Sequence, residues 1–252
     1  MTVAVVAGGV GAARLLGGLA RVVGPAAIPL NNDLRITQFY GAAAHPASPT
    51  LVGGTQDNGT LRYAGAPNAW THPLGGDGGF CASDPTDPNV WYAETQYLAI
   101  RRSTNGRDWT KVSSFRGTNV CAMPGLAVTY FAGSSGEDSI NVATGSFTTW
   151  AHGTNPFEGF PSAVRMATDG EVIAIVGVDG GDLKFATTAN GTAWAVETLP
   201  PPDGTTTPAK LAFVRDGWVL AMANGEIYYK RDAESWAKSE YVMPGGCSWV
   251  AY

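Results

Sequence analysis

Short apolar runs, separated by glycine or polar residues, recur along most of the chain. Runs of this length are typical of β-strands rather than of helices. Each unit opens with one such run, and two further runs follow it. The opening strands are predicted at Tyr40–Ala44, Phe80–Ser83, Val120–Met123, Ala163–Ala167 and Lys210–Val214. The pairs that follow are predicted at Leu51–Gly54 with Thr60–Tyr63, Val90–Glu94 with Leu98–Arg101, Val128–Ala132 with Ser139–Val142, Val172–Val176 with Leu183–Ala186, and Trp218–Met222 with Glu226–Tyr229.

Five tryptophans mark a fourth strand in each unit and give the units a nearly constant period. They are separated by 39, 41, 44 and 42 residues. Four short strands in a unit of about 42 residues are typical of a propeller blade. We therefore predict an all-β fold, a β-propeller of five four-stranded blades between about residues 36 and 243. The five tryptophans are Trp70, Trp109, Trp150, Trp194 and Trp236.

Two of these tryptophans close the same short motif. Ser103–Trp109 and Thr188–Trp194 both follow the pattern Ser or Thr, any residue, Asn-Gly, any two residues, Trp. Asn-Gly readily takes the positive φ angles of a tight hairpin turn, and the hydroxyl can bond backbone groups within that turn. The tryptophan can bury a large apolar area against the blade. We interpret the motif as a structural turn between the third and fourth strands.

The units resemble Asp-box (BNR) repeats, which occur in sialidases, sortilin-like receptors and xyloglucanase-type glycosidases. The resemblance covers about residues 30–252 and is most specific in the two motifs above. Gly53–Thr60 and Gly75–Gly79 look like loops common in sortilin-like bacterial repeats. The Asp that names the box is replaced by Asn105 and Asn190. The resemblance implies a propeller that binds a glycan or a protein, or that hydrolyses a glycoside, and such proteins are often extracellular.

One face of the predicted propeller should be acidic. The loops between second and third strands and the connections between blades lie on the same face, here called the B–C face. Ligand sites commonly lie at such mouths, so we expect this face to bind a sugar, a cation or a basic partner segment. The alternative is that loop Asp and Asn residues only form turns. The candidate ligand-binding residues are Asp57, Asn58, Asp77, Gln96, Tyr97 and Asp138.

The leading functional hypothesis is a non-catalytic binding or scaffold module that presents this face to a glycan or a protein. The alternative is a glycoside hydrolase. Its catalytic pair would be Asp57 and Asp77, because glycoside hydrolysis needs two carboxyl groups flanking the scissile bond and both residues lie in Gly-rich loops. The sialidase family binds its substrate carboxylate with a cluster of arginines from several blades. Here the arginines share no position across the blades and no Phe-Arg-Ile-Pro segment is present, so sialidase activity is not expected.

The first 25 residues do not follow the repeat and form a predicted appendage to a propeller of residues 26–252. Val3–Ala7 is predicted as a strand and Ala12–Val23 as a helix, with a glycine-rich turn between them. Backbone N–H groups at such a helix start can hold an anion.

The stretch Ala7–Leu16 also resembles the N-terminus of the 2-phospho-L-lactate transferase family. That resemblance implies a phosphate-binding loop at Gly8, Gly9 and Gly11, and a third functional hypothesis of a transferase-like fragment. The alternative is an appendage without a binding role.

Composition and charge exclude some classes of binding partner. The net charge of −5 and the pI of about 5.1 argue against nucleic-acid binding, which normally needs a basic stripe. No stretch of 18 uninterrupted apolar residues is present, so no membrane span is expected. The N-terminus lacks the basic region of a secretory signal, and the sequence does not determine the cellular compartment. The ends of the chain could form an incomplete sixth blade; alternatively, the five units leave an open arc whose unpaired edges would favour self-association.

Cysteine and histidine give no clear metal or redox site. Three cysteines are too few for a disulfide framework in a chain of this length. Cys81 and Cys121 occupy equivalent positions in two opening strands, so we expect buried free thiols. The three histidines lack zinc-ligand spacing. We expect no cofactor and no zinc, with Ca²⁺ on the acidic face as the one candidate ion.

Overall fold

The computed structural model describes residues 37–246 apart from 67, 68, 97, 98, 114, 116, 132–137, 146, 148, 162, 232 and 233. The predicted N-terminal appendage, with Gly8, Gly9 and Gly11, lies outside the described residues, as do Tyr97 and Cys247. Within the described part, twenty strands form five antiparallel sheets of four strands each. The predicted all-β propeller fold is therefore confirmed.

The strands of each blade follow one another in chain order and pair with their sequence neighbours. The first two blades comprise β1 (Phe39–Ala44), β2 (Thr50–Thr55), β3 (Gly59–Ala64), β4 (Trp70–Leu74), β5 (Gly78–Ser83), β6 (Trp91–Thr95), β7 (Ala99–Ser103) and β8 (Thr110–Lys111). The third and fourth comprise β9 (Thr118–Met123), β10 (Leu126–Phe131), β11 (Ser139–Thr144), β12 (Trp150–His152), β13 (Arg165–Thr168), β14 (Ile173–Asp179), β15 (Asp182–Thr188) and β16 (Ala195–Thr198). The fifth comprises β17 (Pro208–Val214), β18 (Gly217–Met222), β19 (Glu226–Arg231) and β20 (Ala237–Val242).

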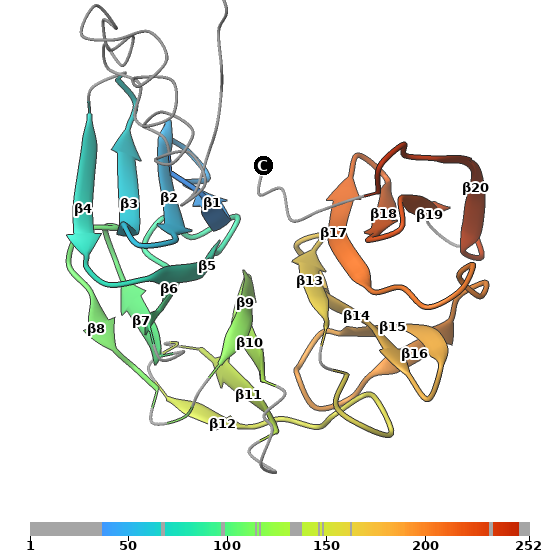
Figure 1. Cartoon of the computed structure of the whole chain (residues 1–252). Coiled ribbons are helices and arrows are strands. Elements are labelled where there is room, and N and C mark those ends of the chain that lie inside the picture. The colour runs from blue at the N-terminus through green and yellow to red at the C-terminus, as the bar shows by residue number, and fades with distance from the viewer. Residues whose placement is uncertain are drawn as a thin grey trace, which may run out of the picture.

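The five blades follow one another in an arc, with their first strands on its inner side (Figure 1). The first strand of each blade is innermost and packs against the first strand of the next blade, from β1 to β5, β9, β13 and β17. The first described blade and the last lie at the two ends of this arc (Figure 1).

Burial of the second strands shows which blades have a neighbour on both faces. Every residue of β6 and β10 is buried, because a blade covers each face of these sheets. In β18 of the last blade, burial alternates, and Val219 and Ala221 are only partly buried. In β2 of the first blade, Leu51 is exposed. Among the described residues, the second strands of the two end blades are therefore less completely covered than β6 and β10.

The recurring tryptophans pack against the preceding blade. The Trp236 ring lies 4.9 Å from that of Phe185 in β15, centroid to centroid, and only 6% of Trp236 is exposed. Trp150 packs edge-on against Tyr92 of β6, at a centroid distance of 5.6 Å. Trp109 and Trp194 pack in the same way, against clusters that include side chains of the first and third blades respectively. Each of these tryptophans joins two blades.

Trp70 in the first described blade differs from the other four. It opens β4, but it has no described blade in front of it and remains 40% exposed. Its ring contacts Tyr63 and Phe39, both of its own blade, with centroids 5.0 and 6.4 Å away.

The turn motif is held by its hydroxyl and its amide. Ser103 Oγ accepts hydrogen bonds from the backbone N–H groups of Asn105 at 3.1 Å and Gly106 at 2.8 Å. Asn105 Oδ1 accepts from the N–H groups of Arg107 and Asp108 at 2.8 and 2.9 Å. The amide oxygen of asparagine thus supplies the acceptor that this turn needs.

The second motif repeats these contacts. Thr188 Oγ1 accepts from the N–H groups of Asn190 and Gly191 at 3.2 and 2.8 Å. Asn190 Oδ1 accepts from the N–H groups of Thr192 and Ala193 at 3.0 and 2.9 Å. The interpretation of both motifs as structural turns agrees with this geometry.

The positive φ angles expected for both residues of each Asn-Gly pair occur only at the glycine. Gly106 and Gly191 have positive φ angles of 68° and 75°, but the preceding asparagines do not. The asparagines instead cap the turn through their side chains. Both glycines also touch the preceding blade, because a Cβ atom at Gly191 would lie 2.6 Å from Val142 and one at Gly106 would lie 3.3 Å from Val52.

The difference between the tryptophans predicts different stability losses. Trp236→Ala should lower the free energy of unfolding by about 3–5 kcal/mol, because it empties a filled site between two blades. Trp70→Ala should lower it by about 1 kcal/mol or less, because much of that ring is already in water. Urea unfolding followed by circular dichroism measures both. Equal losses would contradict the assignment of Trp236 as an interblade contact.

Candidate functional site

Three of the predicted ligand-binding residues lie together on the B–C face. Asp57 is exposed in the turn between β2 and β3, with a φ angle of 62°. Asp77 lies in the connection from β4 to β5, and its Oδ1 accepts a hydrogen bond from the N–H of Asp57 at 2.7 Å. The backbone N–H of Gln96 donates to the carbonyl oxygen of Asp77 at 2.7 Å. Asp77 therefore joins the loops of the first and second blades.

The other predicted residues are arranged differently. Asn58 lies beside Asp57 and is exposed, and its side-chain amide donates to Thr37 Oγ1 at 3.1 Å. Asp138 lies in the third blade, close enough to Tyr130 to help burial raise the pKa of that phenol. The structure thus brings Asp57, Asn58, Asp77 and Gln96 together in the first two blades and places Asp138 in the third.

Other acidic residues of this face also bind backbone amides across blades. Asp179, at the end of β14, accepts from the N–H groups of Glu158 at 2.9 Å and Gly159 at 3.1 Å, and it pairs with Lys184 at 3.1 Å. Burial acts to raise the pKa of Asp179, but these three partners together lower it. Carboxylates on this face therefore fix loops as well as supplying charge.

The equivalent contact in the last blade uses a buried glutamate. Glu226 Oε1 accepts from the N–H of Asp203 at 2.9 Å, and its carboxylate forms an ion pair with Lys238. Burial acts to raise the pKa of Glu226, but Lys238 and the hydrogen bonds outweigh it and lower the pKa to about 2.

A pocket of about 250 Å³ opens beside Asp77. Its most unusual wall residue is Glu94 of β6, which is only 4% exposed and whose Oε2 accepts from the N–H of Phe80 at 3.0 Å. Gly79 makes room for this carboxylate, because a Cβ atom there would lie 2.6 Å from Glu94 Oε2. The lining residues are Tyr40, Asp77, Gly78, Gly79, Phe80, Glu94, Thr95 and Gln96.

Glu94 was not among the residues predicted from sequence, although it ends an otherwise apolar run. Burial raises its pKa to about 7, and the hydrogen bond from Phe80 acts in the opposite direction. Near neutral pH both the protonated and the ionised form of this carboxyl group are therefore populated. Asp57 is not among the described residues that line this pocket, so the pocket brings Asp77 together with Glu94 instead.

Thiols and metal sites add little to the candidate chemistry. Cys81 and Cys121 are buried and free, as predicted, and burial raises the pKa of each to about 12. Among the residues that the structure describes, no group of three or more His, Cys, Asp or Glu side chains could hold a metal ion. No helix within the described ranges is long and apolar enough to cross a membrane.

The fold and its interblade contacts define the chain as a β-propeller protein. Comparisons with protein-family models and with curated proteins find no match. Solved structures do match. One from a nidogen/laminin complex has a TM-score of 0.58 at 11% identity, covering 77% of this chain and 75% of that chain.

Two YCF48 structures are also similar. YCF48 from Cyanidioschyzon merolae has a TM-score of 0.56 at 15% identity and covers 82% of this chain and 70% of its own. YCF48 bound to D1 peptide has a TM-score of 0.54 at 17% identity, with 81% and 67% covered. At these identities the likeness shows the propeller fold alone.

The raised pKa of Glu94 predicts a pH-dependent stability. Between the ordinary value near 4.5 and about 7 the folded state keeps a proton that the unfolded chain has lost. The contribution of Glu94 to the free energy of unfolding should therefore fall as pH rises through this range, by up to about 3 kcal/mol. Glu94→Gln, which keeps an acceptor for Phe80, should remove this dependence.

Urea unfolding at several values between pH 5 and pH 8 measures the difference between variant and wild type. The control is Glu171→Gln, which removes an exposed carboxylate from the turn between β13 and β14. If the difference between Glu94→Gln and wild type stays constant with pH, Glu94 does not titrate in this range.

Proposed function

We propose that the chain is a non-catalytic propeller module that binds a basic segment of a protein partner on the B–C face of its first two blades. The observation that carries the proposal is the pocket that Asp77 and Glu94 both line, with the exposed Asp57 hydrogen-bonded to Asp77. Together the three carboxyl groups favour a cation, and the open loop surface around them suits an extended chain.

The pocket walls suit a lysine or arginine side chain. Tyr40 and Phe80 provide apolar and aromatic surface, against which a long alkyl stem can pack while its charged end reaches the carboxyl groups. A cation arriving beside Glu94 favours the ionised form of that carboxyl group, because an opposite charge nearby lowers a carboxyl pKa. Binding should then release a proton near neutral pH.

The structurally similar propellers favour a protein partner over a glycan. One of them comes from a nidogen/laminin complex, and another, YCF48, is bound to D1 peptide. The resemblance of the repeats to sortilin-like receptors points the same way. Neutral glycans would gain little from the three carboxyl groups, because such ligands carry no charge for them to attract.

A double substitution tests the proposed function. Asp57→Asn with Asp77→Asn removes two charges and keeps an acceptor for the N–H of Asp57. Affinity for lysine- and arginine-rich peptides, measured by fluorescence anisotropy against neutral and acidic peptides, should fall about three- to tenfold. The control, Glu171→Gln with Asp216→Asn, removes two exposed charges from turns on the opposite face and should bind like wild type.

Equal losses in the two double variants would show that only the net charge matters, and would contradict a site on the B–C face. Binding on a glycan array with no preference for basic peptides would replace the protein partner with a glycan.

A glycoside hydrolase is the second candidate, favoured by the pairing of Asp77 with Glu94 in one pocket. A carboxyl group with a pKa of about 7 is suited to act as a general acid. This pair differs from the predicted pair of Asp57 and Asp77. Turnover of chromogenic glycosides that is lost in Glu94→Gln would support hydrolysis, and absence of turnover in the wild type would reject it.

A further inference from the structure

The contact that joins neighbouring blades uses the same position in every described blade. In each of them, the residue three places before the end of the second strand lies opposite a residue of the third strand. We call these five cross-strand pairs the docking pairs. They are Val52 with Arg62, Tyr92 with Arg102, Val128 with Val142, Val176 with Phe185, and Val219 with Tyr229.

In the first four described blades, the following blade packs onto the docking pair. The tryptophans that open the fourth strands of the third and fifth blades pack against Tyr92 and Phe185. The turn glycines of the second and fourth blades approach Val52 and Val142 closely. The docking pair is therefore the place where each blade receives the next one.

The docking pair of the last blade is exposed. Tyr229 is 43% exposed, whereas Phe185, which holds the same position in the fourth blade, is only 2% exposed. Val219 and Tyr229 line a groove of about 710 Å³ together with Val214, which is 52% exposed. The position that Trp236 covers on the fourth blade is thus an accessible apolar groove on the fifth.

The first described blade presents the other half of this contact. Leu51, Tyr63 and Trp70 lie opposite one another on neighbouring strands and therefore share one face of the sheet. Val52, the next residue along β2, is buried with Trp91 of the second blade. Because side chains alternate along a strand, the row of Leu51, Tyr63 and Trp70 faces away from that blade. Leu51 and Trp70 are each 40% exposed.

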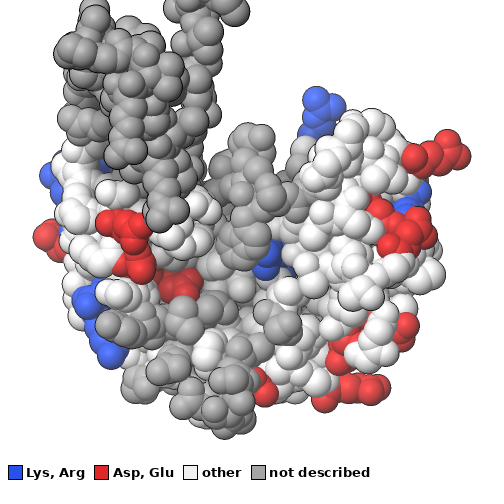
Figure 2. Space-filling view, viewed as in Figure 1, with Lys and Arg blue, Asp and Glu red and all other residues white. Residues whose placement is uncertain are grey.

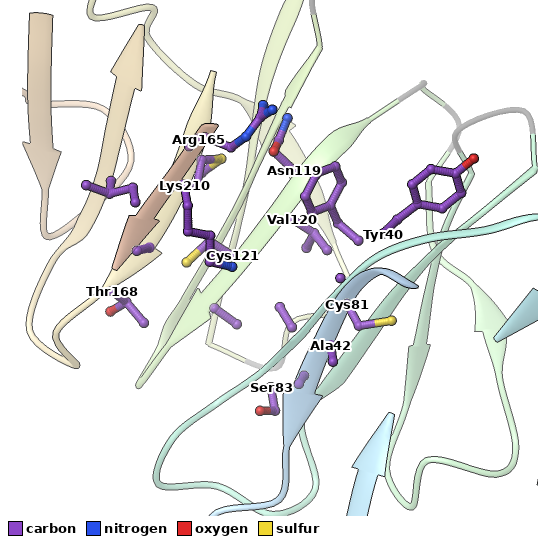
Figure 3. A pocket seen from close by; sticks show the side chains of 18 of the residues that line it. Tyr40, Ala42, Cys81, Ser83, Asn119, Val120, Cys121, Arg165, Thr168 and Lys210 are labelled. Carbon is purple, nitrogen blue, oxygen red and sulfur yellow. The ribbon is translucent and has the colours of Figure 1, made fainter. Parts of the chain in front are cut away.

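The end blades keep the orientation of the inner ones. Their first strands, β1 and β17, line the same central cavity of about 250 Å³ as β5, β9 and β13, and Figure 3 shows Ala42 and Lys210 at its wall. The exposed rows of the first and last blades therefore face along the arc, as the covered faces between the inner blades do. They belong to the two ends of the arc (Figure 1).

We propose that Trp70 of a second copy of this chain packs onto Val219 and Tyr229, so that the last blade of one copy receives the first described blade of another. The occupant is a second copy because the contact continues the interface that the chain already repeats between its own blades. Trp70 is the recurring tryptophan that this repeat leaves exposed. Covering its ring and the receiving groove removes apolar and aromatic surface from water, which favours association.

Such an interface joins two different surfaces, so the copies associate head to tail. Each copy in a pair keeps one unused end, and further copies can add to it.

Sedimentation velocity of the full chain over a range of concentrations tests the proposal. The sedimentation coefficient of the wild type should rise with concentration. Trp70→Ala removes the ring, and Tyr229→Arg places a charge in the receiving groove. Each should weaken association by at least about tenfold, as loss of an aromatic residue at the centre of an interface does. Val196→Arg makes an apolar-to-charged change at an exposed position of β16 that does not line the groove, and it should associate like wild type.

A mixture of the two variants distinguishes a head-to-tail contact from any other. Trp70→Ala keeps the receiving groove and Tyr229→Arg keeps the tryptophan, so an equimolar mixture should form one-to-one dimers although each variant alone stays monomeric. These dimers cannot grow, because both of their remaining ends carry a substitution. Circular dichroism checks that both variants are folded.

A wild type that stays monomeric at every concentration would overturn the proposal and favour another occupant of the groove, such as Trp249 of the same chain. A mixture that associates no better than the separate variants would also overturn it, as would equal weakening by Val196→Arg.

The receiving groove is separate from the proposed peptide site. Figure 2 shows acidic side chains over the first two blades, on the side of the view opposite the last blade. Tyr229→Arg should therefore leave binding of basic peptides to the B–C face unchanged, so the two proposals can fail separately.

Discussion

The structure depends on the packing of an aromatic ring from each blade after the first described one into the side of the blade before it. Trp236 meets Phe185, and Trp150 meets Tyr92, so each contact buries a large apolar area between two sheets rather than within one. Four strands bury too little surface to be stable by themselves, and a repeat gains its stability from such neighbour interfaces. The turns before Trp109 and Trp194 serve the same contact, because Gly106 and Gly191 let the backbone approach the earlier blade closely.

This dependence explains why the fold could be predicted from the sequence. A contact that recurs once in each blade requires a large aromatic side chain at a fixed period, and that period is visible in the order of residues. The backbone angles of the motif were less predictable. Asn105 and Asn190 use their side chains as caps, whereas the sequence alone suggested that they would adopt positive φ angles themselves.

The candidate site was only partly predictable, for a related reason. Asp57, Asp77 and Gln96 could be assigned to one face because strand alternation places their loops there, and the structure joins them through Asp77. The significance of Glu94 depends on its burial and on the room that Gly79 leaves for its carboxylate. Neither leaves a periodic signal, since one charged residue within one copy of a repeat looks like ordinary variation.

The tryptophan contacts also have a direction, because each ring reaches back toward a sheet that comes earlier in the chain. From the second described blade onward, the surface against which each tryptophan packs is therefore translated before the tryptophan itself. Apolar surface is then covered nearly as fast as it is synthesised, which limits the time available for aggregation. Trp70, whose ring is 40% exposed, is the one recurring tryptophan of the described blades that lacks such an earlier surface among the described residues.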